Sequence, residues 1–428
     1  MFFPRTRLLG IRNLRERFNH PLSCRAWLDD FIKAAIDKSI GRIAYACFVI
    51  LNKVRTIRRY DLCSTLGTHD CNLRCGYCFA DSGAYHGQRS LMSLETGKKA
   101  LDFLIKASKH RKHIEVDFFG GEPLLNFDVC RELVKYGKEQ GAIHNKIFKF
   151  TMTTNGVLLT KEVQDFLNEE GISAVLSLDG RKCTNDNMRK FPNGEGSYDL
   201  IVKKFQEFVA NRNGEEYYLR GTYTHHNTDF AADVAHMVEL GFRELSMEPV
   251  VAPAEFDYAL TDEDVFAACR EYEKLGKHYV EQYKKGEPYN FFHFNVDLTG
   301  GPCLPKRLSG CGAGHDYLAI SPEGDLYPCH QFVGEEAYKV GTVDTGIVNF
   351  DLCRDFQKAN VLSKEACMKC WARFYCSGGC HANNLRYGGS LTTPYSKGCT
   401  LQKKRLETAI GVQVQKALYD MEQAEKAE

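Results

Sequence analysis

Three cysteines within eight residues constrain this 428-residue chain more than any other feature of its sequence. Cys71, Cys75 and Cys78 follow the spacing C-x3-C-x2-C. Three thiolates are one too few for a structural zinc site or for the usual four-cysteine iron–sulfur site. If they bind a [4Fe–4S] cluster, one iron keeps an open position that can bind a substrate or cofactor. The alternative is a chance grouping in a cysteine-rich chain.

Composition narrows the class of protein. Hydrophobic residues make up 43% of the chain, which is enough for a sizeable core, and the net charge of +1 gives no global argument for nucleic acid. We find no convincing secretory signal, and the longest apolar run, Ile43–Leu51, is too short to span a bilayer. We therefore expect a cytoplasmic protein, in which closely spaced cysteines more often bind metal than form disulfides.

The other cysteines fall into a C-terminal group and scattered single residues. The C-terminal group contains Cys303, Cys311, Cys329, Cys367, Cys370, Cys376, Cys380 and Cys399. The isolated cysteines are expected to be small core hydrophobes, and they are Cys24, Cys47, Cys63, Cys130, Cys183, Cys269 and Cys353.

Between the two cysteine groups, strand-like segments alternate with helix-like segments. The expected strands are 62–68, 114–119, 149–153, 174–178, 218–223 and 243–249. The expected helices are 94–109, 127–140, 161–169, 198–212 and 229–240. This alternation predicts parallel βαβ units in an α/β fold, and six strands predict a partial (β/α)6 TIM-like barrel. Functional groups collect at the C-terminal ends of the strands in such barrels.

Polar motifs follow three of these strands. Gly120-Gly121-Glu122-Pro123 follows the second strand, Asn155 the third, and the fourth ends in a segment that contains Ser177 and Asp179. An ordinary βα turn with a side chain–backbone hydrogen bond is the alternative for each. Arg189 either pairs with a carboxylate or is a surface arginine.

The cysteine spacing and the Gly120–Pro123 motif resemble the radical S-adenosylmethionine (SAM) enzymes. In that family the open iron chelates SAM, and the reduced cluster cleaves SAM to a 5′-deoxyadenosyl radical. The resemblance implies that Gly120, Gly121 and Glu122 bind the amino group of SAM. The further cofactor-binding residues that we expect are Tyr77 near the adenine, Asn155, Ser177 and Asp179 near the ribose and carboxylate, and Arg189 as a partner for a carboxylate.

The C-terminal cysteines resemble the SPASM domain, an extension of radical SAM enzymes that modify peptides. The match comprises seven cysteines and Gly324 in order. It implies two auxiliary [4Fe–4S] clusters, and hence three in total. The first auxiliary group is Cys311, Cys329 and Cys380, with Cys303 as a possible fourth ligand; the second is Cys367, Cys370, Cys376 and Cys399. Without Cys303 the first cluster would keep an open iron for a thiolate. Zinc is the alternative for Cys367 and Cys370 taken alone.

The residue after the second cysteine of this domain helps to indicate which class of substrate the enzyme modifies. Sulfatase-maturating enzymes have an aspartate there as their proposed base, whereas this chain has His330. Segments 117–123, 220–222, 301–311 and 327–334 instead resemble maturases of SCIFF peptides (ranthipeptides or sactipeptides), which form thioether crosslinks in ribosomally made, Cys-rich peptides. His330 is either a proton acceptor or a hydrogen-bonding residue beside the cluster.

This resemblance implies an oxidoreductase that acts on a precursor peptide with a leader, draws electrons from a flavodoxin or ferredoxin-type reductant, and works in the cytoplasm of an anaerobic organism. The alternatives are another SPASM maturase, such as a formylglycine-forming sulfatase maturase, and a non-catalytic iron–sulfur electron carrier. The Gly120–Pro123 motif favours an enzyme, because an electron carrier needs no SAM site.

We expect four parts: an N-terminal basic segment 1–60, a radical SAM partial barrel 61–298, a SPASM domain 299–400 and a C-terminal helix 401–428. The first part contains 13 Lys+Arg and 4 Asp+Glu. A basic surface for an acidic leader, a degenerate leader-recognition region and nucleic-acid binding are the alternatives for it.

Overall fold

The computed structural model describes residues 62–212, 214–298 and 304–427. The chain forms two compact units, 1–59 and 60–428, and only the second contains described residues. The expectations for residues 1–60 and for Cys303 therefore lie outside the described residues.

One twelve-stranded sheet organises the described residues, in the order β12-β11-β10-β9-β1-β3-β4-β5-β6-β7-β8, with β2 paired to β1. The strands are β1 Leu62–His69, β2 Ser90–Leu91, β3 His113–Gly120, β4 Ile147–Thr154, β5 Ser173–Ser177, β6 Tyr217–Tyr223, β7 Glu244–Pro249, β8 Asn290–Phe291, β9 Tyr317–Ile320, β10 Asp325–Tyr327, β11 Gly341–Thr342 and β12 Gly346–Ile347. The pairs from β1 through β3 to β7 are parallel, which confirms the six predicted strands.

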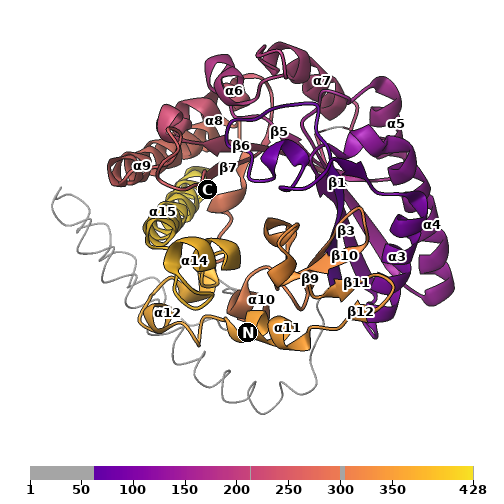
Figure 1. The fold of residues 1–428 in the computed structure, drawn as a ribbon. Coiled ribbons are helices and arrows are strands. Elements are labelled where there is room, and N and C mark those ends of the chain that lie inside the picture. The colour runs from indigo at the N-terminus through magenta and orange to yellow at the C-terminus, as the bar shows by residue number, and fades with distance from the viewer. Residues whose placement is uncertain (1–61, 213, 299–303, 428) are drawn as a thin grey trace, which may run out of the picture. The chain divides into compact units, whose positions relative to one another are not determined.

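Helices on the outside of this curved sheet complete the barrel, as Figure 1 shows for α3, α4, α5, α7 and α8. The helices are α3 Leu94–Ser108, α4 Phe127–His144, α5 Lys161–Glu169, α6 Lys182–Met188, α7 Tyr198–Ala210, α8 Phe230–Glu239, α9 Asp262–Lys285, α10 Leu304–Ser309, α11 Phe350–Lys358, α12 Glu365–Met368, α13 Arg373–Cys376, α14 His381–Gly388 and α15 Ser396–Ala427. Short 3-10 helices are η2 Asp81–Gly83, η3 Pro123–Asn126, η4 His225–Asn227, η5 Phe292–Phe294, η6 His330–Phe332 and η7 Glu336–Tyr338.

The core lies between the sheet and these outer helices. Strand β3 shows why: Ile114, Val116 and Phe118 alternate along it and are almost fully buried, while the intervening residues lie on the other face of the sheet. Phe205 and Phe208 of α7 are also fully buried. Each such side chain contributes roughly 1.5–3 kcal/mol by leaving water.

The sheet continues from the barrel into the C-terminal cysteine region. Strand β9 pairs in parallel with β1, and β10, β11 and β12 follow as antiparallel strands. The predicted boundary at residue 299 therefore divides one continuous sheet, and the four-part division stays a prediction.

The short helices α6 and α10–α14 were not predicted, and the two longest helices also differ from expectation. Helix α15 begins at Ser396, not at 401, and so contains Cys399 in its first turn. Helix α9 was not predicted, although Thr261 and Asp264 form a capping box at its start. The two helices pack together, and Tyr283 donates a hydrogen bond to Asp420 Oδ1 over 2.8 Å.

The structure describes the side chains of four of the seven isolated cysteines, and three of these four behave as predicted, while the prediction for Cys24, Cys47 and Cys63 stays untested. Cys130 is buried in the main core, and Cys269 and Cys353 pack partly buried against it. Cys183 is exposed on α6, so its assignment to the core was wrong. A helix of seven residues buries only one face, and Cys183 lies on the other.

No helix among the described residues is long and apolar enough to cross a membrane.

Candidate active site

The loop with Cys71, Cys75 and Cys78 directly follows β1. Two backbone hydrogen bonds hold it to the segment after α6: Arg74 N donates to the carbonyl oxygen of residue 190 over 2.7 Å, and Gly76 N to that of residue 188 over 2.9 Å. The three thiols lie close enough for the charges of Cys75 and Cys78 to act on Cys71. Burial raises the pKa of Cys71 to about 12 and that of Cys75 to about 11. Because a bound metal favours the thiolate form, this donor set fits a metal cluster.

The described residues do not hold a site for a single metal ion, because no three His, Cys, Asp or Glu side chains among them converge on one point. A [4Fe–4S] cluster requires a different arrangement of its ligands. Each thiolate binds its own iron at a corner of the cluster, so the sulfurs surround a volume instead of one atom. The zinc alternative for Cys367 and Cys370 stays open on this observation alone.

Gly120 and Gly121 bring the end of β3 against the chain that leads to Cys71. A Cβ at Gly120 would lie 2.4 Å from the backbone nitrogen of Thr68, and one at Gly121 would lie 2.0 Å from the oxygen of Asp70. Gly121 N donates to Thr68 O over 2.6 Å. Any larger residue would push the cysteine loop away from the strand end.

Glu122 lies in the protein interior and connects the ends of β3 and β4. Its Oε1 accepts hydrogen bonds from Thr154 Oγ1 at 2.8 Å and Leu124 N at 3.1 Å, and its Oε2 accepts one from Asn155 N at 2.8 Å. Burial raises the pKa of Glu122 to about 7, although these three donors lower it. Both carboxylate oxygens thus contact protein donors, and the predicted contact with the SAM amino group stays a prediction.

Asn155 extends this connection to the cysteine loop. Its Nδ2 lies 2.8 Å from Asn72 Oδ1 and 3.6 Å from Cys71 Sγ. Its Oδ1 accepts a hydrogen bond from Val157 N at 3.0 Å, which is the side chain–backbone turn considered for this motif. Ser177 ends β5 and pairs in register with Arg220 of β6.

Tyr77, Asp179 and Arg189 contact one another beside the same loop, where Asp179 and Arg189 are buried and Tyr77 is partly buried. Tyr77 donates a hydrogen bond to Asp179 Oδ2 over 2.6 Å, and the Arg189 guanidinium lies 5.5 Å from the centre of the Tyr77 ring. Arg189 Nε lies 3.1 Å from Asp179 Oδ2, although its hydrogen is poorly aligned, so we describe the contact as an ion pair. Burial alone would lower the pKa of Arg189, but Asp179, Tyr77 and Cys75 raise it above its usual range. Arg189 thus pairs with a carboxylate, and the surface alternative was wrong.

His330 lies among aromatic rings near the barrel interior. Its ring centre is 5.5 Å from that of Phe79 and 4.9 Å from that of Phe119, and its Nδ1 lies 2.7 Å from the Tyr317 hydroxyl. Burial and, to a smaller extent, the charge of Arg220 lower the pKa of His330 to about 4. The imidazole is therefore neutral near pH 7. Its predicted roles as proton acceptor or hydrogen-bonding residue stay predictions.

Two residues of this region received no role from the sequence. Asp117 shares a face of β3 with Phe119, and its Oδ1 accepts a hydrogen bond from Thr153 Oγ1 at 3.3 Å. Burial raises its pKa to about 7, while Thr153 and Arg220 lower it. Tyr85 is almost fully buried, and the charges of both Cys78 and Cys329 act on it. A single aspartate in a strand and a single tyrosine in a loop carry no spacing signal that could have marked them.

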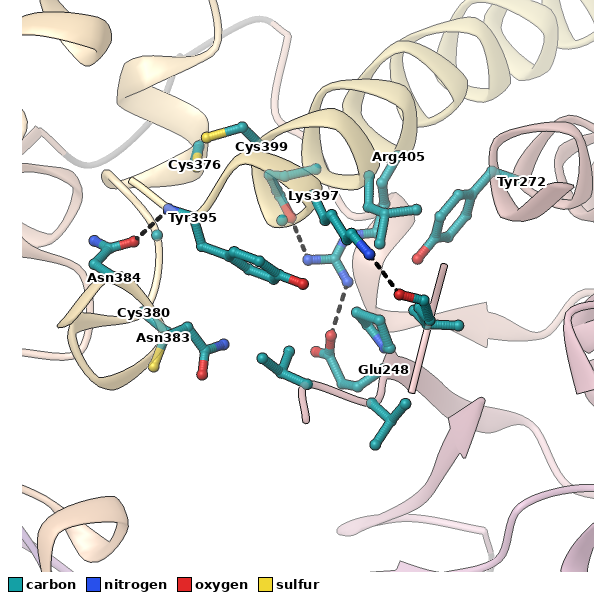
Figure 2. A pocket seen from close by; sticks show the side chains of 18 residues that line it. Glu248, Tyr272, Cys376, Cys380, Asn383, Asn384, Tyr395, Lys397, Cys399 and Arg405 are labelled. Atoms are coloured by element: carbon teal, nitrogen blue, oxygen red, sulfur yellow. Dashed lines mark hydrogen bonds and ion pairs between the residues drawn. The ribbon is translucent and has the colours of Figure 1, made fainter. Parts of the chain in front are cut away.

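Members of each auxiliary group lie near one another, and their assignment as cluster ligands stays a prediction. The charges of Cys311 and Cys380 act on the thiol of Cys329, which shows that the three residues of the first group lie near one another. In the second group, Cys367, Cys370 and Cys376 all act on Cys399. Figure 2 shows Cys376 and Cys399 side by side, while Cys380 lies apart from them.

A cavity of about 250 Å³ lies between the cysteine region and the barrel, lined by residues of β7, α9 and α15 together with Cys376, Cys380 and Cys399 (Figure 2). Arg405 Nη1 donates to Glu248 Oε2 over 3.0 Å, and Lys397 Nζ donates to Leu260 O over 2.6 Å. These bonds connect α15 to the barrel and fix one wall of the cavity.

Comparisons with known proteins agree with this geometry. Residues 62–202 match a family described as a 4Fe-4S single cluster domain, and residues 311–371 match SPASM, an iron-sulfur cluster-binding domain. The cysteine-type anaerobic sulfatase-maturating enzyme of Clostridium novyi is 25% identical over 338 residues, covering 73% of this chain and 86% of that enzyme. The mycofactocin maturase MftC of Mycolicibacterium smegmatis is 28% identical over 343 residues, covering 76% of this chain and 79% of the relative.

The fold is also that of a solved structure. The structure of native anSMEcpe with bound AdoMet and Kp18Cys peptide superposes with a TM-score of 0.66 at 21% identity, covering 82% of this chain and 99% of that chain. This confirms the predicted α/β fold with a partial barrel followed by a cysteine-rich domain. Together with the cysteine groups, these findings show that the chain contains a 4Fe-4S cluster domain and a SPASM domain and that it is similar to maturase enzymes.

Proposed function

We propose that this enzyme installs thioether crosslinks, from a cysteine sulfur to a carbon atom, in a ribosomally made, Cys-rich peptide. The observation that carries the proposal is the three-thiol group of Cys311, Cys329 and Cys380, whose Cys329 precedes His330 beside the barrel interior. Three thiols from the described residues leave a place for a fourth, and if Cys303 does not take it, the substrate cysteine can. When bound, the clusters supply the electron that cleaves SAM and remove the surplus electron of crosslinking.

The residues around the first loop would bind and orient SAM. Cys71, Cys75 and Cys78 would hold the SAM-binding cluster, with Gly120 and Gly121 keeping the adjacent strand end close. Tyr77, Asp179 and Arg189 supply a rigid, charged wall on the other side of the loop. We assign Glu122, Asn155 and Ser177 to the same SAM site.

The C-terminal residues would hold the peptide and the auxiliary clusters. The first and second auxiliary groups would each hold one cluster, and Cys303 is the candidate for a fourth ligand of the first. Phe79, Phe119 and Tyr317 contact His330, although Phe79 is 39% exposed, so a bound peptide would be needed to keep water from this place. A pKa of about 4 makes His330 a weak base, which favours its role as a hydrogen-bonding residue beside the cluster over its role as a proton acceptor.

A peptide substrate is supported by two related structures, one solved with a Kp18Cys peptide and one of SuiB from Streptococcus suis bound to precursor peptide SuiA. We extend this to a precursor peptide with a leader. A flavodoxin or ferredoxin-type reductant and a cytoplasmic location belong to the same proposal.

The second candidate is a sulfatase-type maturase, which the Clostridium novyi relative favours. His330 counts against it, since the resembled maturases have an aspartate at that position. Formylglycine formation consumes a cysteine without joining it to another residue, so the product distinguishes the two.

The test is anaerobic incubation of the reconstituted enzyme with SAM, reductant and a Cys-rich peptide encoded beside its gene. We expect each crosslink to remove two hydrogens and to protect one cysteine from iodoacetamide, because a thioether sulfur is no longer a nucleophile. A matched peptide with serine for cysteine should not react. Modification of both peptides, or an aldehyde product, would contradict thioether formation.

A further inference from the structure

Lys364 is a buried lysine that the reaction described above does not use. Its side chain is 0% exposed, and it directly precedes α12, three residues before Cys367. Its Nζ donates a hydrogen bond to Gly378 O over 2.8 Å. Burying an ammonium is costly unless a nearby opposite charge compensates it.

Burial lowers the pKa of Lys364, and the negative groups that oppose this and favour the ammonium form are cysteines. The charges of Cys367, Cys376, Cys380 and Cys399 all act on Lys364, and Lys364 in turn acts on Cys311. Cys311 and Cys380 belong to the first auxiliary group and the others to the second. A single cation therefore faces both groups.

The backbone segment that joins the two cysteine groups contacts the Lys364 ammonium. Ser377, Gly378 and Gly379 join Cys376 of the second group to Cys380 of the first, and all three have positive φ, at 67°, 82° and 77°. A Cβ at Gly378 would lie 3.1 Å from Lys364 Nζ. The carbonyl of Gly378 thus turns toward the ammonium with no side chain in between.

We propose that Lys364 is the shared counter-charge of the two auxiliary clusters and raises their reduction potentials. A cluster bound by thiolates is anionic and gains one more negative charge on reduction. A fixed cation in a medium of low dielectric constant therefore favours the reduced state. The inference rests on the cluster ligands of the proposed function and is independent of the peptide substrate.

Potentiometric EPR titration of the reconstituted full-length enzyme tests this. Lys364→Gln keeps a donor for Gly378 O but removes the charge, Lys364→Met removes both, and Lys364→Arg keeps the charge. We expect more negative midpoint potentials for the auxiliary signals in the Gln and Met variants, and values near wild type in the Arg variant. The same titration with Cys71, Cys75 and Cys78 all changed to alanine identifies the auxiliary signals.

Lys403→Gln is the matched control. The charge of Lys403 acts on Cys367 and Cys399, as the charge of Lys364 does. Because the Lys403 side chain is exposed, water and salt screen its charge. We expect a much smaller shift from this variant.

Unchanged midpoint potentials in iron-replete Lys364→Gln and Lys364→Met would overturn the proposal. Iron loss in these two variants with retention in Lys364→Arg would support it, because charge would then be needed for cluster assembly. Iron loss in all three would overturn it and leave Lys364 a packing role. Absence of auxiliary signals in the wild type would contradict the proposed function itself.

Discussion

The barrel and the C-terminal cysteine region share one sheet but are held together by different forces. The barrel strands β1 and β3–β7 have five to eight residues each and pack on a large apolar core. Strands β10–β12 have two or three residues, and the separate core beside the cysteines contains only five buried residues. Lys364, His381 and Asn384 are buried in that region. The barrel is therefore stabilised by burial of apolar surface, whereas we expect the cysteine region to depend more on metal ligation.

Removing iron should have the largest effect and should act on one region only. We expect residues 304–399 to lose protection in hydrogen exchange when the reconstituted enzyme is stripped of iron anaerobically, because metal binding supplies their folding free energy. Strands β3–β7 should stay protected. Equal loss of protection in both regions would remove the distinction between them.

Cys329→Ala should remove one cluster, about four irons per chain, without loss of the SAM-binding cluster. The reason is that Cys329 belongs to the first auxiliary group, distant in sequence from Cys71–Cys78. Iron analysis measures the loss, and Cys183→Ala is the matched control because Cys183 is exposed and isolated. Full iron content in Cys329→Ala would refute the assignment.

Phe205→Ala should destabilise the barrel with or without iron. Phe205 is fully buried, so its truncation leaves a cavity that costs about 3–5 kcal/mol in the free energy of unfolding. Denaturant unfolding of the metal-free protein measures this cost. Phe266→Ala is the control, since Phe266 is 64% exposed. A similar loss in both variants would mean that apolar burial does not stabilise the barrel as argued.

The sequence predicted the barrel well because its strands and helices follow the periodicities of a half-buried sheet and amphipathic helices. The cysteine groups could be predicted from the spacing of the cysteines. Tyr77, Asp179 and Arg189 lie close together because the strands of a parallel sheet end at the same edge. Strands β9–β12 were not predicted because two to four residues carry no periodicity. Lys364 and Asp117 were missed because only the tertiary structure buries them.

Asp179→Ala should weaken SAM binding roughly tenfold, the size expected for loss of a charged hydrogen-bonding partner. The change leaves Arg189 without its carboxylate and Tyr77 without its acceptor. Anaerobic binding measurements check this, with unchanged iron content showing that no ligand was lost. Asp229→Ala is the control, because Asp229 is an exposed partner of Arg181. Equal affinity in both variants would exclude Asp179 from the SAM site.

The smallest effect concerns Asp117 and pH. Burial raises its pKa in the folded protein from 3.8 to about 7, so the folded state holds a proton that the unfolded chain has lost. This stabilisation is complete below the unfolded pKa and disappears as pH rises through about 7. Unfolding of the metal-free protein between pH 5 and 8 should therefore show wild type losing stability relative to Asp117→Asn. Parallel pH profiles would contradict the raised pKa.

The most direct test of the account measures 5′-deoxyadenosine and crosslinked peptide in the same anaerobic reaction. Wild type should form both. The variant with Cys71, Cys75 and Cys78 all changed to alanine should form neither, because SAM cleavage requires the first cluster. Cys329→Ala should still form 5′-deoxyadenosine but no crosslink, since the C-terminal region acts after SAM cleavage. The account would be contradicted if Cys329→Ala formed crosslinks at the wild-type rate, or if the triple variant formed 5′-deoxyadenosine. Either result would mean that SAM cleavage and crosslinking are not carried out by the two separate regions.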